Sequence, residues 1–382
     1  MRRGGRGTDR TSDHASDQGS DHGTDRGGVL RGTAVTVAVL LLAAAGGTAH
    51  AASTGSAGTA TGPAAAPGHG RPPTNGFSPT GPWNTRLPHD VPLAANSAAI
   101  VANIVQDKTE NYGSWAVNTD EYSAPILTVD RRTPRTTWTY SNCLDRPDLA
   151  PVIASSLVGV PTPPDLLASK GTDASVAIYQ PSTDTYWDFW RAEKDAAGHW
   201  SACWGGRIDH YSHNPGIFTN PLGATATGLP FGAFTIRIDE LRRGHIDHAL
   251  NLVTVRTRAN CFSWPATRDD GNTDGADLPC EGQRFRLDPA FDVSTLLSPA
   301  ARTIARAMQE YGLVLTDKGG ALVTYAEDPR PYAAAHGGVD PYLQLMDPDN
   351  LVPDGSEKYY VLHDVPVERL QALPLDYGRH GS

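Results

Sequence analysis

The stretch ATATGLPFGAFTIRIDELRRGHIDHALNLVTV, residues 224–255, decides the fold predicted for this chain, because it places turn residues and ionisable groups between two apolar runs. Its pattern predicts a strand over residues 232–238 and one helical turn over residues 239–243. Gly244 should end that turn in a left-handed conformation. A second strand is predicted over residues 245–256. We therefore expect the functional centre of the chain to lie here.

The second predicted strand has two different faces, since side chains alternate along a strand. One face carries Ile246, His248, Leu250 and Leu252, and the other carries His245, Asp247, Ala249 and Asn251. His248 therefore shares the apolar face. A lone histidine there is usually a satisfied core residue, and the alternative is a general acid or base that lines a binding site.

The region from Thr74 on, roughly 300 residues, is long enough to bury a sizeable core. Its many glycines and prolines and its short apolar runs between turn residues indicate a mainly β fold. We predict one domain over residues 74–382, a β-sandwich or jelly roll of the concanavalin type with a few peripheral helices. The further predicted strands cover residues 124–130, 174–180, 185–192, 283–287, 312–316 and 321–326.

Helix signals are few. Residues 97–105 begin with a serine cap, and residues 298–311 combine a serine cap with Pro299 in the first turn and Gly312 as the stop. Residues 317–320, Asp-Lys-Gly-Gly, predict a hairpin turn between two neighbouring strands.

The first 51 residues predict a signal peptide with a long polar n-region, because the apolar run over residues 35–45 is followed by the small-x-small pattern Ala49-His50-Ala51. A signal anchor is the alternative. Residues 52–73 are rich in Ala, Gly, Pro, Ser and Thr and predict a flexible linker. We therefore expect a secreted, extracellular protein.

Net charge and hydrophobicity each exclude one class of partner. Cleavage of the leader lowers the formal net charge from −10 to −11, and no basic cluster is available to neutralise phosphates, so nucleic-acid binding is not expected. No second long apolar run follows the leader, so no membrane contact is expected after cleavage.

The four cysteines of an exported chain predict two disulfides with a structural role. Three pairings are possible. Cys261 with Cys280 would close a polar loop, which leaves Cys143 for Cys203, and this is the pairing that we predict.

The strand TYWDFWRA, residues 185–192, is aromatic on both faces, with Tyr186, Asp188 and Trp190 on one of them. Aromatic rings that flank a carboxylate suit a sugar, whose apolar face stacks on a ring while its hydroxyl groups bind charged acceptors. The plainer interpretation is that one face is core and the other an exposed sheet surface. We predict that the chain acts on extracellular polysaccharide or oligosaccharide.

Glycoside hydrolysis needs one protonated and one ionised carboxyl group. Asp188 with Asp247 or Glu240 is the predicted catalytic pair, and Asp188 and Asp247 could face each other on neighbouring strands. His248 would tune or relay protons. Each carboxylate alone is more often a cap or an ion-pair partner, and Glu240 in a helical turn suits local capping.

Two other functions remain open. A polysaccharide lyase would use His248 as base, while Arg237, Asn251 or Tyr211 assists. A non-catalytic carbohydrate-binding protein would need only the aromatic face. Whether the chain is an enzyme or a binding protein, the predicted substrate-binding residues are Tyr186, Trp190, Arg237 and Asn251. A structural or adhesive surface protein would bind no soluble sugar.

The predicted chemistry requires no cofactor, but one loop has the spacing of a calcium site. Asp270, Asn272, Asp274 and Glu281 fit D-x-[DN]-x-[DN]-G-x5-E, although no helices are predicted on either side. The pattern has two interpretations, a loop that binds a structural Ca2+ and a solvated acidic loop without a metal ion. The spacing of His210 with His213 and of His245 with His248 suggests a zinc site. Residues three apart on a strand face opposite ways, however, so such a pair could not bind one ion together there.

Several motifs together resemble a group of uncharacterised secreted, mostly actinobacterial proteins. They are PWNTRLP, the Y-x-D-F-W strand, Trp-Gly-Gly at residues 204–206, G-x-I-x-H-A-L at residues 244–250 and R-A-x-x-x-Y-G at residues 306–312. The resemblance covers nearly all of the globular region. It implies a shared fold and transfers no activity.

Overall fold

A computed structural model describes residues 75–346, 351–354 and 357–379. The predicted signal peptide and linker lie outside this range. The described residues belong to one compact unit. Among them, no helix combines the length and the apolar character needed to cross a membrane.

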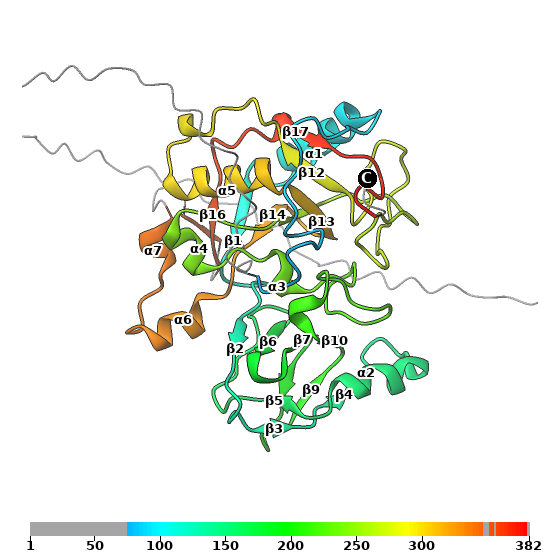
Figure 1. Cartoon of the computed structure of the whole chain (residues 1–382), viewed down its shortest axis with the longest axis vertical. Helices are drawn as coiled ribbons and strands as arrows, with labels where there is room; N and C mark the ends of the chain where they lie inside the picture. Colours follow the sequence, from blue (N-terminus) through cyan, green and yellow to red (C-terminus); the bar gives the residue numbers. More distant parts are fainter. Residues whose placement is uncertain (1–74, 347–350, 355–356, 380–382) are drawn as a thin grey trace, which may run out of the picture. The chain divides into compact units, whose positions relative to one another are not determined.

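The largest sheet has eight strands and mixed direction (Figure 1). Parallel pairing joins β1 to β14 and β11 to β13, and the other pairs are antiparallel. The strands, in sheet order, are β15 (Leu351–Asp354), β16 (Glu357–Val361), β1 (Trp115–Asn118), β14 (Leu322–Tyr325), β11 (Leu250–Thr254), β13 (Leu313–Lys318), β12 (Arg284–Leu287) and β17 (Leu370–Ala372).

Two long helices contribute to the core of this sheet, α1 (Ser97–Glu110) and α5 (Pro299–Glu310). Ser298 caps α5, as predicted, by accepting a hydrogen bond from the Ala301 N–H. Ile104 of α1 and Met308 of α5 are completely buried in the same hydrophobic cluster as the strand residues Leu250 and Leu252. The predicted helix at residues 97–105 is confirmed and continues to Glu110, but its predicted serine cap is wrong, because Asn96 occupies the N-cap position and no side chain caps the helix.

A second sheet of four strands contains the aromatic strand. Its order is β10 (Trp204–Asp209), β7 (Thr185–Trp190), β6 (Val176–Gln180) and β2 (Ile126–Thr128). Two small sheets complete this part, β3 (Arg135–Thr136) with β5 (Val160–Pro161), and β4 (Thr139–Tyr140) with β9 (Trp200–Ala202) and β8 (Glu193–Lys194). Helix α2 (Ala150–Ser156) contributes Ile153 to their core.

Short helices fill the connections, among them α3 (Phe231–Phe234), α4 (Ile238–Arg243), α6 (Pro329–Ala335) and α7 (Tyr342–Leu345). The 3-10 turns include η1 (Pro147–Leu149), η2 (Pro181–Thr183), η3 (Tyr211–His213), η4 (Val293–Thr295) and η6 (Val367–Arg369).

One aromatic cluster draws on both large sheets. Tyr186 of the four-stranded sheet and Val314 of the eight-stranded sheet are completely buried in it, together with Phe77 and Phe234. Tyr186 stacks on Tyr211 with ring centroids 5.2 Å apart. The two sheets therefore share a core, and residues at its edge can come from both.

The prediction of a mainly β fold with a minority of helices is confirmed. The sandwich or jelly-roll arrangement stays a prediction. The predicted strands over residues 124–130, 174–180, 185–192, 283–287, 312–316 and 321–326 all contain an observed strand.

The predicted strand over residues 232–238 is wrong. Phe231–Phe234 forms a helical turn behind Pro230, and α4 already begins at Ile238. Glu240 caps α4 by accepting a hydrogen bond of 2.8 Å from the Arg237 N–H, and Gly244 ends it with a φ of 67°. The local end signals therefore outweighed the apolar pattern.

Two further strand predictions need correction. The strand predicted from His245 begins only at Leu250, so the alternation predicted for residues 245–249 does not apply. The predicted hairpin over residues 317–320 is also wrong, because β11 lies between β13 and β14 in the sheet. A short turn suggested adjacent strands, but β11 occupies the place between them.

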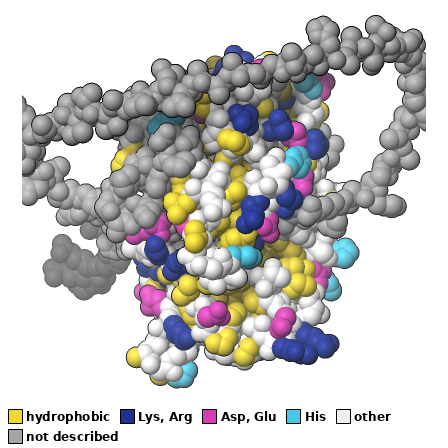
Figure 2. Space-filling model, turned by 90° about the vertical axis from the view of Figure 1, so that its left-hand side faces the viewer, with side chains coloured by type: hydrophobic (Ala, Val, Ile, Leu, Met, Phe, Trp, Pro, Cys, Tyr) yellow, Lys and Arg dark blue, Asp and Glu magenta, His cyan; other side chains and the backbone are white. Residues whose placement is uncertain are grey.

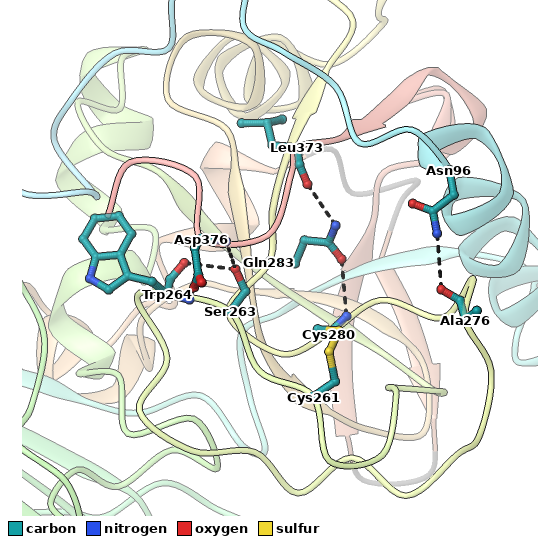
Figure 3. Close-up of a disulfide and its surroundings, with 9 residues drawn as sticks. All are labelled: Asn96, Cys261, Ser263, Trp264, Ala276, Cys280, Gln283, Leu373 and Asp376. Atoms are coloured by element: carbon teal, nitrogen blue, oxygen red, sulfur yellow. Dashed lines mark hydrogen bonds between the residues drawn. A yellow bond between two sulfur atoms is a disulfide. The ribbon is translucent and has the colours of Figure 1, made fainter. Parts of the chain in front are cut away.

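The predicted disulfides are confirmed as Cys143–Cys203 and Cys261–Cys280. Figure 3 shows the second disulfide and its surroundings. The side chain of Gln283 accepts a hydrogen bond from the Cys280 N–H and donates one to the Leu373 carbonyl group. The disulfide loop is thereby held against the C-terminal segment of the described chain.

Candidate functional site

Asp188 lies on β7 and is completely buried. Its carboxylate accepts hydrogen bonds from the backbone N–H groups of Ala224 (3.0 Å) and Phe231 (3.2 Å) and from the Tyr186 hydroxyl (3.3 Å). Burial raises the pKa of Asp188 to about 7, although these hydrogen bonds favour the charged form. Asp188 therefore anchors the two ends of the segment between Ala224 and Phe231.

Arg268 binds the backbone around the start of this segment, from Pro221 to Thr225. Its guanidinium donates hydrogen bonds of 2.6 to 2.9 Å to four carbonyl groups, those of Pro221, Leu222, Gly223 and Thr225. Burial lowers the pKa of Arg268 to about 10, which leaves it charged at neutral pH. A buried carboxylate and a partly exposed guanidinium thus fix the backbone that opens the predicted functional stretch.

Glu240 and His248 form a completely buried pair, with His248 Nε2 3.2 Å from Glu240 Oε2. Burial acts to lower the pKa of His248, but the Glu240 carboxylate outweighs it, so this pKa is raised. Arg237 lies beside this pair and binds Glu327 at 2.8 Å, while donating a hydrogen bond to the Ile126 carbonyl group. The cluster connects α4 to both large sheets.

Asp247 does not face Asp188 on a neighbouring strand, so that prediction is wrong. Asp188 lies on β7 of the four-stranded sheet, whereas Asp247 precedes β11 of the eight-stranded sheet. Asp247 binds His245 instead, with 2.6 Å between Oδ1 and Nε2, and its side chain is 28% exposed. The structure brings Glu240 and His248 together and gives Asp188 and Asp247 other partners.

The four predicted substrate-binding residues differ in exposure. Tyr186 is completely buried and accepts a hydrogen bond from the Gly232 N–H. Asn251 is also buried; its Oδ1 accepts a hydrogen bond from the Tyr325 N–H, and its Nδ2 has no protein partner. Arg237 and Trp190 are partly exposed.

The predicted calcium ligands are spread over the surface and the interior. Glu281 is completely buried and accepts a hydrogen bond from the Asp270 N–H, while Asn272 and Asp274 are exposed. Asp270 binds the Lys318 ammonium group at 3.2 Å. Within the described ranges, no group of three His, Cys, Asp or Glu side chains is arranged to hold a metal ion. Calcium binding stays a prediction.

The structure also assembles a set of residues from four separate segments, of which sequence reasoning selected only Trp190 as a site residue. We call this set the Asp317 cluster, and all its members are partly exposed. It comprises Asp173, Trp190, Arg191, Asp317 and Tyr325.

Within the Asp317 cluster, the charge of one carboxyl group changes the pKa of another. Burial and the negative charges of Asp270 and Asp173 raise the pKa of Asp317 well above its ordinary value. Burial also raises the pKa of Asp173, but the Trp190 N–H and the Arg191 charge act against that rise. Burial and both carboxylates raise the pKa of Tyr325. The pKa of Asp317 is thus raised more strongly than that of Asp173.

The backbone next to Asp173 and Trp190 is strained. Ala174 and Arg191 have φ values of 41° and 49°, in a region that residues with a Cβ atom rarely adopt. Their backbones are hydrogen-bonded across the two segments, from Arg191 N to Asp173 O at 2.7 Å and from Ala192 N to Ala174 O at 2.9 Å. Strain that pairing enforces is typical of functional sites.

Only weak signals in the sequence pointed to these residues. Asp317 precedes Lys-Gly-Gly, which suits a turn, and Asp173 lies between two predicted strands. The surface seen in Figure 2 mixes Lys and Arg with Asp and Glu around hydrophobic side chains, so no single charge dominates that face.

Comparisons with protein-family models, curated proteins and solved structures find no match for this chain.

Proposed function

We propose that the chain is a secreted glycoside hydrolase that acts on extracellular polysaccharide, with Asp317 as general acid and Asp173 as the partner carboxylate. One observation carries this proposal. The partly exposed carboxyl groups of Asp173 and Asp317 come from segments of the two different large sheets, and the charge of Asp173 acts on Asp317. Glycoside hydrolysis needs such a pair in unequal protonation states.

The roles follow from the surroundings of each group. Asp317 keeps its proton and donates it to the glycosidic oxygen as the bond from that oxygen to the anomeric carbon breaks. Asp173 is assigned the ionised role, since the Trp190 N–H and the Arg191 charge limit the rise of its pKa that burial causes, and it stabilises or attacks the positive anomeric carbon, or activates water there. Tyr325, kept protonated, is a hydrogen-bond donor to the substrate.

Trp190 suits the sugar itself. Its indole is partly exposed, unlike the completely buried Tyr186, and it is the member of the aromatic strand that a pyranose ring can stack on. Because the Trp190 Nε1 also binds Asp173, a stacked sugar would lie next to the reacting carboxylate.

Burial argues against the pairs favoured by the sequence alone. Asp188, Glu240 and His248 are completely buried, and each is occupied by bonds that hold the fold. The shared aromatic core also supports the proposal that the two large sheets pack face to face, as in a β-sandwich. The two disulfides are compatible with an exported protein.

The test is hydrolysis of a panel of plant, fungal and bacterial cell-wall polysaccharides by the purified protein. Reducing ends and ultraviolet absorbance are read in parallel, because a lyase also forms an unsaturated product. We expect reducing ends without absorbance, lost in Asp317→Asn and kept in Asp209→Asn, a control at an exposed aspartate of β10. Rising absorbance would indicate the lyase, and binding without turnover would indicate a carbohydrate-binding protein.

A further inference from the structure

Arg191 follows directly on strand β7, and its guanidinium lies over the neighbouring indole. Its guanidinium carbon is 4.5 Å from the centroid of the Trp190 ring. The Trp190 Nε1 in turn donates a hydrogen bond of 2.9 Å to Asp173 Oδ1. Guanidinium, indole and candidate catalytic carboxylate therefore form one continuous set.

The charge of Arg191 has no ion-pair partner among the described residues, since none of their carboxylate oxygens lies within 4.0 Å of its guanidinium. Its one side-chain hydrogen bond is a long contact of 3.6 Å from Nη1 to Cys143 Sγ. By contrast, Arg237, Arg256 and Arg330 of the same fold all bind carboxylates. Arg191 thus retains free donors at a partly exposed position.

We propose that Arg191 binds the carboxylate of the substrate, so that the sugar held on Trp190 is a uronic acid. This inference rests on the proposed function, because it assigns the substrate class of the same site. A guanidinium stacked on an indole has a fixed plane, and its free edge presents parallel N–H groups that match the two oxygens of a carboxylate. Stacking leaves that edge open, since it uses only the face.

Local charge explains why such a residue is needed. The chain carries a formal net charge of −10, and Asp173 itself would repel an acidic sugar. A guanidinium between the bound carboxylate and Asp173 offsets that repulsion. The left-handed backbone of Arg191, with its N–H bound to the Asp173 carbonyl group, fixes the side chain at this place.

The test compares uronic-acid oligosaccharides with their carboxyl-reduced forms, which keep the linkage and lose only the charge. Trimers of galacturonate, glucuronate and alginate are titrated into Asp317→Asn protein by calorimetry, so that binding is read without turnover. Arg191→Gln and Arg191→Lys are made in that background, with Arg207→Gln as control, since Arg207 is an exposed arginine of β10 that binds Asp209.

We expect at least one acidic trimer to bind about tenfold or more tightly than its reduced form. Arg191→Gln should abolish that preference, Arg191→Lys should restore it only in part, and Arg207→Gln should retain it. Equal binding of acidic and reduced trimers, binding of none, or a preference that survives Arg191→Gln would overturn the inference. So would equal Arg191-dependent binding of a sulfated galactan oligosaccharide.

The two proposals fail separately. Turnover of neutral polysaccharides by the wild-type protein, unchanged in Arg191→Gln, would keep the hydrolase and overturn the uronate site. Arg191-dependent uronate binding without turnover by the wild-type protein would keep the uronate site and overturn the hydrolase.

Discussion

The indole nitrogen of Trp190 donates a hydrogen bond of 2.9 Å to Asp173 Oδ1, at the point where strand β7 ends. The bond ties an aromatic surface to a carboxylate whose pKa is raised by burial. Because an N–H donor favours the charged form, it limits that rise. The pair therefore sets the pH at which Asp173 becomes ionised.

Trp190→Phe keeps an aromatic ring but removes this donor. The pKa of Asp173 should rise further, so the acidic limb of the pH profile of kcat/KM should move upward by about one pH unit. Rates well above that limb should change little. An acidic limb that stays in place would show that Asp173 does not control it.

Ala174→Gly tests the strain beside Asp173. Because glycine adopts a φ of 41° without penalty, the variant should be more stable than wild type by about 1 kcal/mol in chemical denaturation. We expect kcat to fall at the same time, since Asp173 is then held less firmly. Lower stability would mean that the alanine side chain contributes more than the strain costs.

Asp188 should make stability depend on pH. Its pKa is about 7 in the folded protein and near 3.8 ordinarily, so between these values the folded state holds a proton that the unfolded state has lost. The free energy of unfolding should therefore fall as pH rises through this window, by up to roughly 1.4 kcal/mol per pH unit, and level off above it.

Asp188→Asn removes this ionisation and should make the slope shallower, with the remaining slope due to other carboxyl groups of raised pKa such as Asp317, whereas Asp209→Asn, at an exposed position, should leave the slope unchanged. Urea denaturation at several pH values between 4 and 8 measures the difference. The same slope in wild type and Asp188→Asn would assign the pH dependence to other groups.

The Glu240–His248 pair should be structural. His248→Gln should reduce the free energy of unfolding by about 3 to 5 kcal/mol, because Glu240 remains buried and loses the charge of His248. The pKa of His248 is raised from 6.5 in the folded state, so the contribution of the pair is complete below pH 6.5 and is lost as pH rises through the raised value.

Activity decides between this role and the catalytic role predicted from the sequence. We expect kcat/KM per folded molecule to stay within about threefold of wild type in His248→Gln at a temperature where the variant is folded. A loss of a hundredfold or more with an intact fold would restore His248 as a catalytic residue.

Local signals were sufficient wherever the structure is determined locally. Helix α5 was predicted from its cap Ser298, its Pro299 and its stop Gly312, all of which act within one turn. The strand around Asp188 followed from alternation. The disulfide pairing followed from the short loop between Cys261 and Cys280.

Predictions failed where distant segments decide. The turn after Asp317 resembles a hairpin, but β11 inserts between the strands that it joins, and sequence spacing carries no sign of that insertion. His248 was recognised as part of an apolar face, yet its partner Glu240 was predicted only as a catalytic carboxylate or a helix cap, not as the partner of His248. Glu240 serves both roles, which only the path of the loop after Gly244 makes possible.

The candidate site could not be predicted for the same reason. Asp173, Asp317 and Tyr325 come from separate segments, and each alone resembles a common turn or strand residue. Their mutual effect on pKa arises only after both sheets have packed on one core. From Trp190 and the aromatic strand, the sequence predicts a carbohydrate-active protein, which stays a prediction, and two of the carboxylates that it selects, Asp188 and Glu240, are buried.

The most direct test of the central claim is the dependence of Asp317→Asn activity on the leaving group. The substrate is an aryl glycoside series of the sugar that the polysaccharide panel identifies. If Asp317 is the general acid, kcat/KM should fall by about 10²- to 10⁴-fold for poor leaving groups and little for dinitrophenyl glycosides, which need no proton. An equal loss for all leaving groups, or no loss, would contradict the assignment of Asp317 as the acid.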